Sequence, residues 1–263
     1  MSAVPHPEAP HLLREDRAGI ATLTMNRPQQ MNLLTSAMLA ALQDAFDAIG
    51  ADPSVRVVVL AGAGKGFCAG HDLKEIRALG AQPKIEALFA QCSRMMQSIA
   101  ALPQPVIARV HGAAAAAGCQ LVAQCDLAVA SEAAKFTTPG VNWGFFCSTP
   151  GVAVGRNVSR KRAMEMLLTG DLVDAQQALE WGLVNQVVPA EALDAAVDAL
   201  ARKIAAKPPA TVAAGKRAFY QQMDLGVAGA YELASGVIAC SFAHPEGREG
   251  MDAFIEKRPP NWK

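Results

Sequence analysis

Hydrophobic residues follow two different spacings along the first part of the chain. The segment GIATLTMN (19–26) alternates apolar and polar residues, which predicts a strand. The segment at 35–53 begins with Thr-Ser, has apolar residues at helical spacing and ends in a Gly/Pro stop, which predicts a helix. Short apolar runs typical of strands covered on both faces follow at VRVVVLAG (55–62), PVIARVHG (105–112) and DLAVAS (126–131). Strands that alternate with helices predict an α/β architecture.

The pattern changes after GLVNQVVP (182–189). Residues 191–257 are mostly Ala, Leu, Lys, Glu and Gln at helical spacing, with breaks at Pro208-Pro209 and His244-Pro245. We therefore expect a core at 1–190 and a C-terminal helical oligomerisation domain at 191–263. These helices are too few to bury their own apolar faces, so they should pack on the core or on a neighbouring subunit.

The composition narrows the classes of function. The 24 basic residues balance the 24 acidic ones, so no excess charge favours nucleic acid as a partner. Hydrophobic residues make up 51% of the chain, yet it has no run of eighteen or more apolar residues, the length needed to span a bilayer. No membrane partner is therefore expected. The start, MSAVPHPEAPHLLRED, has no signal or transit pattern, which predicts a cytoplasmic location. The six cysteines form no CxxC pair and fit buried free thiols, with no metal site.

A glycine-rich segment, VVVLAGAGKGFCAGHDLKE (57–75), suggests a nucleotide loop at first sight. Phe67 breaks a dinucleotide-binding fingerprint, and Lys65 is followed by Gly66 rather than by the Ser or Thr of a phosphate-binding loop. The second half, FCAGHDL, contains Gly70, which lets the backbone turn sharply. The segment FCAGHDL is therefore a candidate functional site.

A second candidate is AAAAAGCQLVAQCD (113–126), where a run of alanines meets Gly118 and a helix is expected to begin. Such small side chains would let a ligand approach the backbone closely. Tight packing between a helix and a sheet is the alternative explanation.

Together these segments resemble the enoyl-CoA hydratase/isomerase (crotonase) superfamily. The resemblance is carried, in order, by NRPQQMNLLT, GKGFCAGHDLKE, the segment at 105–131, FTTPGVNWG, AMEMLLTGDLVDAQQALEWGLVNQVV and EGMDAFIEKR. Within the superfamily, the chain is most similar to the enoyl-CoA hydratase domain-containing protein three subgroup. The resemblance implies a ClpP-like spiral of ββα turns with a C-terminal helical trimerisation domain. It also implies assembly as a homotrimer or a dimer of trimers.

The ligand implied by the resemblance is an acyl-CoA thioester, with coenzyme A as part of the substrate and no separate cofactor. Its thioester oxygen would lie between the backbone N–H groups of His71 and Ala117, where a helix N-terminus favours negative charge. The residues expected near CoA are Arg27, Ala69, His71, Asp72, Leu73, Lys74, Phe254 and Lys257. The segment RPQQMN often carries a basic residue in the family, so Gln29 and Gln30 are departures.

The two positions where hydratases of this family carry glutamates hold Gln120 and Gly140. Glutamine accepts no proton near neutral pH, and glycine has no side chain for acid/base work. We therefore expect weak or altered enzymatic activity, such as decarboxylation, isomerisation or thioester hydrolysis. A catalytically silent acyl-CoA-binding or regulatory protein is the alternative, and an RNA-binding member of the family is a weaker one. If the site is otherwise intact, restoring both carboxylates should raise hydration.

The His71 imidazole is the leading substitute for proton transfer, although a side chain directed at solvent or a CoA phosphate is the competing prediction. Cys147 and Ser148 lie near the second glutamate position, but no adjacent base favours a nucleophile.

Other polar residues have simpler expected roles. Asn142 and Gln120 could bind a polar acyl group. His111 is expected to pack at a strand end, and Asp72 and Asp126 to fix turns through local hydrogen bonds.

Overall fold

A computed structural model describes residues 9–262, in which two sheets form the centre of the molecule. The larger sheet has the spatial order β1 (Leu12–Arg17), β2 (Ile20–Met25), β3 (Val57–Gly62), β4 (Val106–Val110), β6 (Leu127–Ser131) and β9 (Gln186–Val188). Only β1 runs antiparallel to its neighbour, and the other pairs are parallel. The strands expected within 19–26, 55–62, 105–112 and 126–131 are confirmed.

The smaller sheet has three short strands. It consists of β5 (Ala113–Ala115), β7 (Lys135–Thr137) and β8 (Val173–Asp174). The first part of the alanine run is therefore a strand, which the sequence did not predict, and the strand β1 was also missed. The helix expected from about Gly118 is α4 (Ala117–Gln124).

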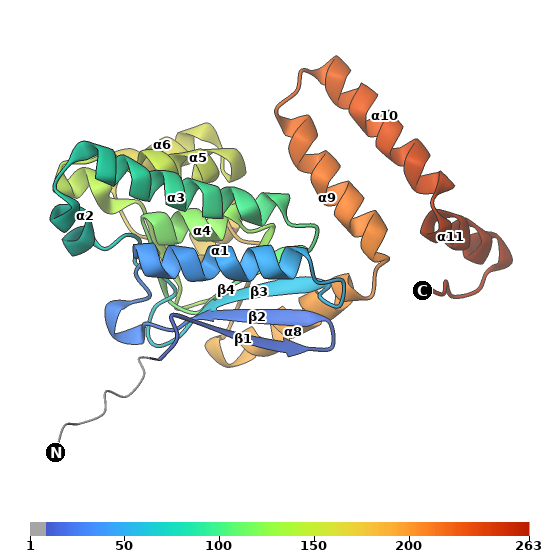
Figure 1. The fold of residues 1–263 in the computed structure, drawn as a ribbon, viewed down its shortest axis with the longest axis horizontal. Coiled ribbons are helices and arrows are strands. Elements are labelled where there is room, and N and C mark those ends of the chain that lie inside the picture. The colour runs from blue at the N-terminus through green and yellow to red at the C-terminus, as the bar shows by residue number, and fades with distance from the viewer. Residues whose placement is uncertain (1–8, 263) are drawn as a thin grey trace.

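Helices cover both faces of the larger sheet (Figure 1). On one face, α1 (Ser36–Gly50) and α3 (Gln82–Ala101) pack over Val58 and Leu60 of β3. On the other face, α8 (Leu193–Ala205) packs over Val57 and Val59. Because both sets of side chains are buried, β3 has the continuous apolar sequence that predicted a strand covered on two sides.

The remaining helices of the body complete the layers around the sheets. They are η1 (Pro28–Gln30), α2 (Leu73–Leu79), η2 (Pro139–Trp143), α5 (Ser148–Asn157), α6 (Arg160–Thr169), α7 (Ala175–Trp181) and η3 (Ala190–Ala192). The helix expected within 35–53 is confirmed as α1, and the Thr35 hydroxyl caps it by accepting the Met38 N–H at 3.2 Å.

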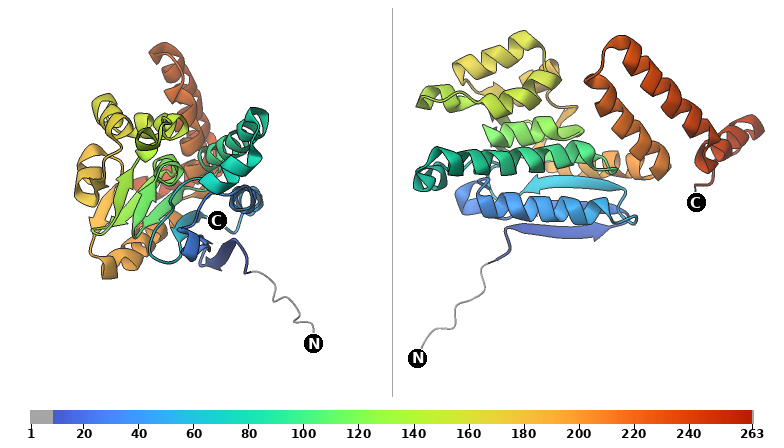
Figure 2. Two further views of the ribbon diagram at one scale, coloured as in Figure 1. Left: turned by 90° about the vertical axis from the view of Figure 1, so that its left-hand side faces the viewer. Right: turned by 45° about the horizontal axis from the view of Figure 1, so that its top comes forward.

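The last three helices form an arm that projects from the body (Figure 1 and Figure 2). They are α9 (Pro209–Met223), α10 (Val227–Ala243) and α11 (Pro245–Glu256). The expected breaks at Pro208-Pro209 and His244-Pro245 are confirmed. The helix α8 follows residue 190 in the chain but packs on the sheet, so the helices that leave the body begin at Pro209.

A buried polar cluster joins the arm to the body. The Lys216 ammonium of α9 donates to the Ile99 carbonyl at 2.8 Å, the Gln104 carbonyl at 3.0 Å and the Asp126 carboxylate at 2.6 Å. Asp126 also accepts the Tyr220 hydroxyl at 2.8 Å. The expectation that Asp126 fixes a local turn is therefore wrong, because its carboxylate binds side chains about ninety residues along the chain.

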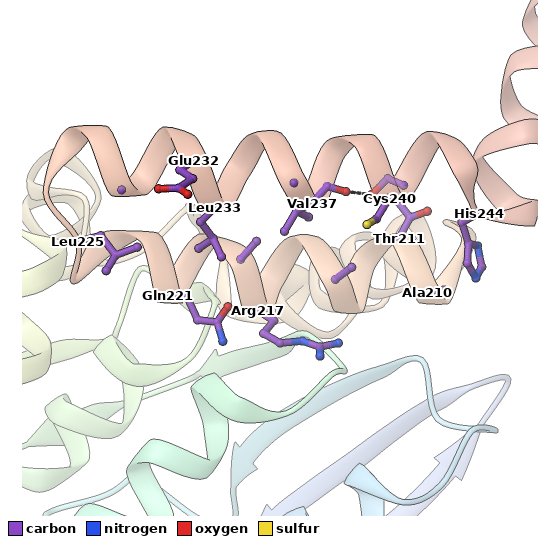
Figure 3. A pocket seen from close by; sticks show the side chains of 15 residues that line it. Ala210, Thr211, Arg217, Gln221, Leu225, Glu232, Leu233, Val237, Cys240 and His244 are labelled. Carbon is purple, nitrogen blue, oxygen red and sulfur yellow. Dashed lines mark hydrogen bonds between the residues drawn. The ribbon is translucent and has the colours of Figure 1, made fainter.

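The arm leaves much apolar surface exposed. A groove of about 850 Å³ runs between α9 and α10, where Leu233 and Val237 extend from α10 toward α9 (Figure 3). No residue of α9 or α10 is fully buried. The large exposed apolar side chains of the arm are Phe219, Met223, Leu225, Val227, Tyr231, Ile238, Phe242, Met251, Phe254 and Ile255. Among the described residues, no helix is long and apolar enough to cross a membrane.

Candidate functional site

The site lies where the segment after β3 meets the junction of β5 and α4. The Ala115 N–H donates to the Cys68 carbonyl at 2.9 Å, which holds the two segments side by side. A Cβ on Gly118 would lie only 2.0 Å from the same carbonyl oxygen. Glycine is therefore required at this position, and the alanines before it allow the close approach of two backbones.

Gly70 brings the second segment to the start of α4. Its φ of +92° is in the region that favours glycine, and an added Cβ would lie 3.0 Å from the Ala115 oxygen and 3.2 Å from the Ala117 nitrogen. The residue that follows, His71, therefore has its backbone beside the first residue of α4.

The N–H groups of His71 and Ala117 are both available to a ligand. Neither donates a hydrogen bond to another described residue. Ala117 is the first residue of α4, so its N–H belongs to the unpaired amides at a helix N-terminus, where partial positive charge accumulates. Two such amides close together are suited to binding an oxygen that carries negative charge.

Both residues line a cavity of about 630 Å³. Most of the residues that the sequence predicted for the site are brought together in its wall: Ala69, His71, Asp72, Leu73, Lys74, Ala117 and Gly140. Cys147 and Ser148 line it as well, whereas Gln120 and Asn142 are not among the lining residues.

The other residues predicted near CoA lie elsewhere. Arg27 donates to the Pro10 carbonyl at 3.0 Å and to the Asn26 carbonyl at 2.8 Å, so its guanidinium is engaged at the surface. Phe254 and Lys257 belong to α11 and its cap, at the opposite end of the molecule from α2 (Figure 1). Within one chain they do not reach the cavity, and a contribution from a neighbouring subunit stays a prediction.

The His71 imidazole is turned into the protein. Its Nδ1 lies 3.1 Å from the Leu34 carbonyl, and its ring packs edge-on against Phe89 at 4.9 Å. A carbonyl only accepts, so Nδ1 carries the proton, and Nε2 is a buried acceptor with no partner among the described residues. Burial lowers the pKa of the imidazole, which favours the neutral ring. The alternative that this side chain points to solvent is therefore wrong.

Gln120 is buried in the first turns of α4. Only 5% of its surface is exposed, and its Oε1 has no hydrogen-bond partner among the described residues. Its amide oxygen is a second unpaired acceptor close to the start of α4, although it is not exposed at the cavity surface.

The second predicted glutamate position has no room for a side chain. A Cβ on Gly140 would lie 2.7 Å from the Phe145 oxygen and 2.8 Å from the Cys147 Sγ. A glutamate at Gly140 would therefore require the loop to rearrange, and restored hydration with glutamates at both positions stays a prediction.

The remaining candidates have structural partners. Burial raises the pKa of the Cys147 thiol, and the Ser148 hydroxyl donates to the Phe146 carbonyl at 3.4 Å, so neither is activated as a nucleophile. His111 lies after β4 and its Nε2 contacts the Gly64 carbonyl at 2.9 Å, which confirms packing at a strand end. Asp72 caps α2 by accepting the Lys74 N–H at 2.8 Å, which confirms its local role.

The sequence did not identify the aromatic part of the wall. Trp143, Phe145 and Phe146 all line the cavity, and Phe89 joins them from α3. A signal was present, because aromatic residues make up only 5% of the chain, yet three of them occur at 143–146. All six cysteines have free thiols and five are buried as predicted, but Cys240 of α10 is exposed, so the expected burial is wrong there.

The largely parallel sheet with helices on both faces belongs to the crotonase fold class, as the solved structures reported below show. The sequence profile of the family described as Enoyl-CoA hydratase/isomerase matches residues 15–263. The chain belongs to this family.

Relatives support the same assignment over nearly the whole chain. The enoyl-CoA hydratase domain-containing protein 3, mitochondrial, of Xenopus laevis is 45% identical over 253 residues, which cover 96% of this chain and 86% of that protein. A solved enoyl-CoA hydratase from Mycobacterium smegmatis is 55% identical, with a TM-score of 0.95 over 97% of this chain and 99% of that one. The human domain-containing protein 3 structure is 42% identical, with a TM-score of 0.93 over 96% of this chain and 100% of that one.

Proposed function

We propose that the protein binds an acyl-CoA thioester with the thioester oxygen between the backbone N–H groups of His71 and Ala117. The observation that carries this proposal is the pair of unpaired amides beside one cavity, one of them at the N-terminus of α4. Donors fixed in this way stabilise the negative charge of an enolate or a tetrahedral intermediate without having to reorient.

The proton chemistry of the site is weak. Gln120 and Gly140 occupy the positions where the family resemblance places the hydratase glutamates, and neither residue can act as a general acid or base near neutral pH. The neutral His71 imidazole is the remaining candidate base, with Nε2 as the accepting atom. Burial lowers its pKa, so it accepts protons less readily than an ordinary imidazole. Enzymatic activity on the thioester is therefore altered or reduced, with hydration slow.

Further proposals concern CoA and assembly. The first turn of α2, with Lys74 exposed at the cavity edge, supports binding of the CoA portion. Arg27 would contact the nucleotide, and Phe254 and Lys257 would do so from a neighbouring subunit.

The exposed apolar side chains of the arm support assembly as a homotrimer or a dimer of trimers. A cytoplasmic location also stays a proposal. The names of several vertebrate relatives contain the word mitochondrial and do not support it.

A second candidate is an acyl-CoA-binding protein without turnover. The contacts at Gly140 favour it, because the Phe145 carbonyl and the Cys147 thiol fill the space that an acid side chain would need. The cavity and the paired amides would then serve binding alone.

One experiment addresses both candidates. Crotonyl-CoA binding is measured by calorimetry, and its hydration is followed in the same preparation by loss of the conjugated thioester absorbance. Binding with hydration roughly 10⁴-fold or more below that of a hydratase with both glutamates is expected, because each acid/base group contributes about 10²- to 10⁴-fold. Turnover of other thioesters would then separate the altered enzyme from the silent binder. Failure of crotonyl-CoA and free CoA to bind would refute both.

A further inference from the structure

Each of the two amides proposed to bind the thioester belongs to a peptide group whose carbonyl is held by a hydrogen bond. The Gly70 carbonyl accepts the Leu34 N–H at 2.8 Å. The Ala116 carbonyl accepts the Gln120 N–H of α4 at 3.0 Å. Both peptide groups are trans, so the N–H lies on the edge opposite to the carbonyl. The hydrogen bonds of the two carbonyls therefore fix the directions in which the two amides point.

Ala116, the residue before α4, has a backbone conformation that favours glycine. Its φ is +50° and its ψ is −117°. Met31 and Lys257 also have positive φ values, but their ψ values of 36° and 37° place them in the left-handed helical region, which side chains tolerate better. Ala116 lies outside that region, so its Cβ is strained where a glycine would not be. The Ala116 N–H donates to the Thr137 carbonyl of β7 at 2.9 Å, so hydrogen bonds hold this residue on both sides.

The Ala116 methyl group is a contact between the two segments that carry the amides. It lies 3.0 Å from the point where a Cβ of Gly70 would be, so it faces the bare backbone of that glycine. The Ala117 nitrogen lies 3.2 Å from the same point. Ala116 also lines the cavity. Without this methyl group, the segment at Gly70 would lose a contact that limits its movement relative to the start of α4.

We propose that Ala116 is a positioning residue for the two amides, because its methyl group and its restrained backbone keep the Ala117 N–H directed at the same ligand oxygen as the His71 N–H. This inference rests on the proposed function, since it concerns how the two amides hold one thioester oxygen. Ala116 acts through the amide of the next residue, because its own N–H and carbonyl are already paired.

A glycine in place of Ala116 would relieve the strain at a cost in positioning. It would remove the methyl contact with Gly70 and widen the range of backbone conformations open to this residue. The two amides would then be less well preorganised, and preorganised donors are the ones that stabilise negative charge on an oxygen.

The test compares butyryl-CoA with S-butyl-CoA, a thioether that has the same chain length and lacks the carbonyl oxygen. The ratio of their dissociation constants, measured by calorimetry, isolates the contribution of the two amides. The parent protein should bind the thioester roughly tenfold or more tightly, as expected for two hydrogen bonds. Ala116→Gly should reduce this ratio by about threefold or more, with the affinity for S-butyl-CoA nearly unchanged. Its free energy of unfolding should not fall, which separates a loss of positioning from a loss of folding.

Ala41→Gly is the matched control, because Ala41 lies in the middle of α1 and does not line the cavity. It should weaken folding and leave the ratio unchanged. An unchanged ratio in Ala116→Gly, or an equal fall in Ala41→Gly, would overturn the assignment of Ala116 and leave thioester binding at the amides intact. Equal affinities of the parent protein for the two ligands would instead refute the proposed position of the thioester oxygen itself.

Discussion

The Gly140 backbone packs directly against the Cys147 side chain. The Gly140 N–H donates to Sγ at 3.3 Å, and the same sulfur would lie 2.8 Å from a Cβ on residue 140. The position at which the family resemblance places a glutamate is thus filled by the loop that follows it. Both the residue type and the loop conformation therefore leave no acid side chain at this position.

Gly140→Ala should therefore destabilise the protein. A methyl group at this position must displace the Phe145 carbonyl or the Cys147 thiol, and overpacking of this kind costs about 1–3 kcal/mol. Gly155→Ala is the matched control, because nothing lies within 4 Å of its Cβ position in α5, and it should stabilise by about 0.5–1 kcal/mol. Urea unfolding of both variants checks this. Equal stability of Gly140→Ala and the parent would mean that the loop yields easily.

Ala116, just before α4, has a backbone conformation that suits glycine. Its φ of +50° and ψ of −117° cost a residue with a Cβ about 1–3 kcal/mol. Ala116→Gly should remove this strain and offset its own entropic cost, so that the free energy of unfolding stays level or rises. Ala41→Gly in the middle of α1 should instead lose about 1 kcal/mol. Similar losses in the two variants would show that Ala116 is not strained.

The ion pair between Lys216 and Asp126 should stabilise the packing of the arm on the body. Its side chains are only 6% and 14% exposed, so Lys216→Met leaves a buried carboxylate without its cation, at a cost of about 3–5 kcal/mol. Adding Asp126→Asn should recover part of that loss. Arg202→Met breaks the exposed pair with Asp198 and should cost less than about 1 kcal/mol. Denaturant midpoints compare the variants, and equal effects of Lys216→Met and Arg202→Met would contradict the prediction.

Stability should fall in mildly acidic solution. Burial lowers the pKa of the His111 imidazole from its ordinary 6.5. Just below pH 6.5 the unfolded chain therefore binds a proton that the folded protein does not. This contribution to stability is complete above that pH and is lost as the pH falls toward the folded pKa. The His71 pKa is lowered in the same direction.

The comparison is a urea midpoint at pH values of about 7.5 and 5.5. The midpoint of the parent should be lower at the acidic pH. His111→Gln keeps a donor for the Gly64 carbonyl and removes the titrating group, so its midpoint should fall by less. An equal fall in the variant would assign the acid sensitivity to other groups.

Much of the fold could be predicted from local patterns. The alternation at 19–26 and the apolar run at 55–62 predicted β2 and β3, because strand and helix spacings are read within a few residues. The strand β5 could not be predicted in this way. Three alanines have no distinctive pattern, and their conformation is set by pairing with β7 and with Cys68.

The close approach of the two backbone segments at the site could be predicted from the sequence, whereas the contacts of individual side chains could not. The glycines and alanines around His71 and Ala117 indicated close backbone approach from the sequence alone. The partner of Asp126 was not predictable, because Lys216 lies ninety residues away and only the tertiary fold brings them together. The lack of space at Gly140 was not predictable either, because it is set by the positions of the Phe145 carbonyl and the Cys147 thiol in the folded loop.

The most direct test of thioester binding at the His71 and Ala117 amides is a crystal structure of the protein with bound octanoyl-CoA, whose saturated chain cannot be turned over by hydration. We predict that the thioester oxygen lies within about 3.2 Å of the amide nitrogens of both His71 and Ala117, as hydrogen bonds require. The acyl chain should lie along the wall that contains Trp143. A thioester oxygen far from both amides, with the acyl chain outside this cavity, would show that the ligand binds elsewhere.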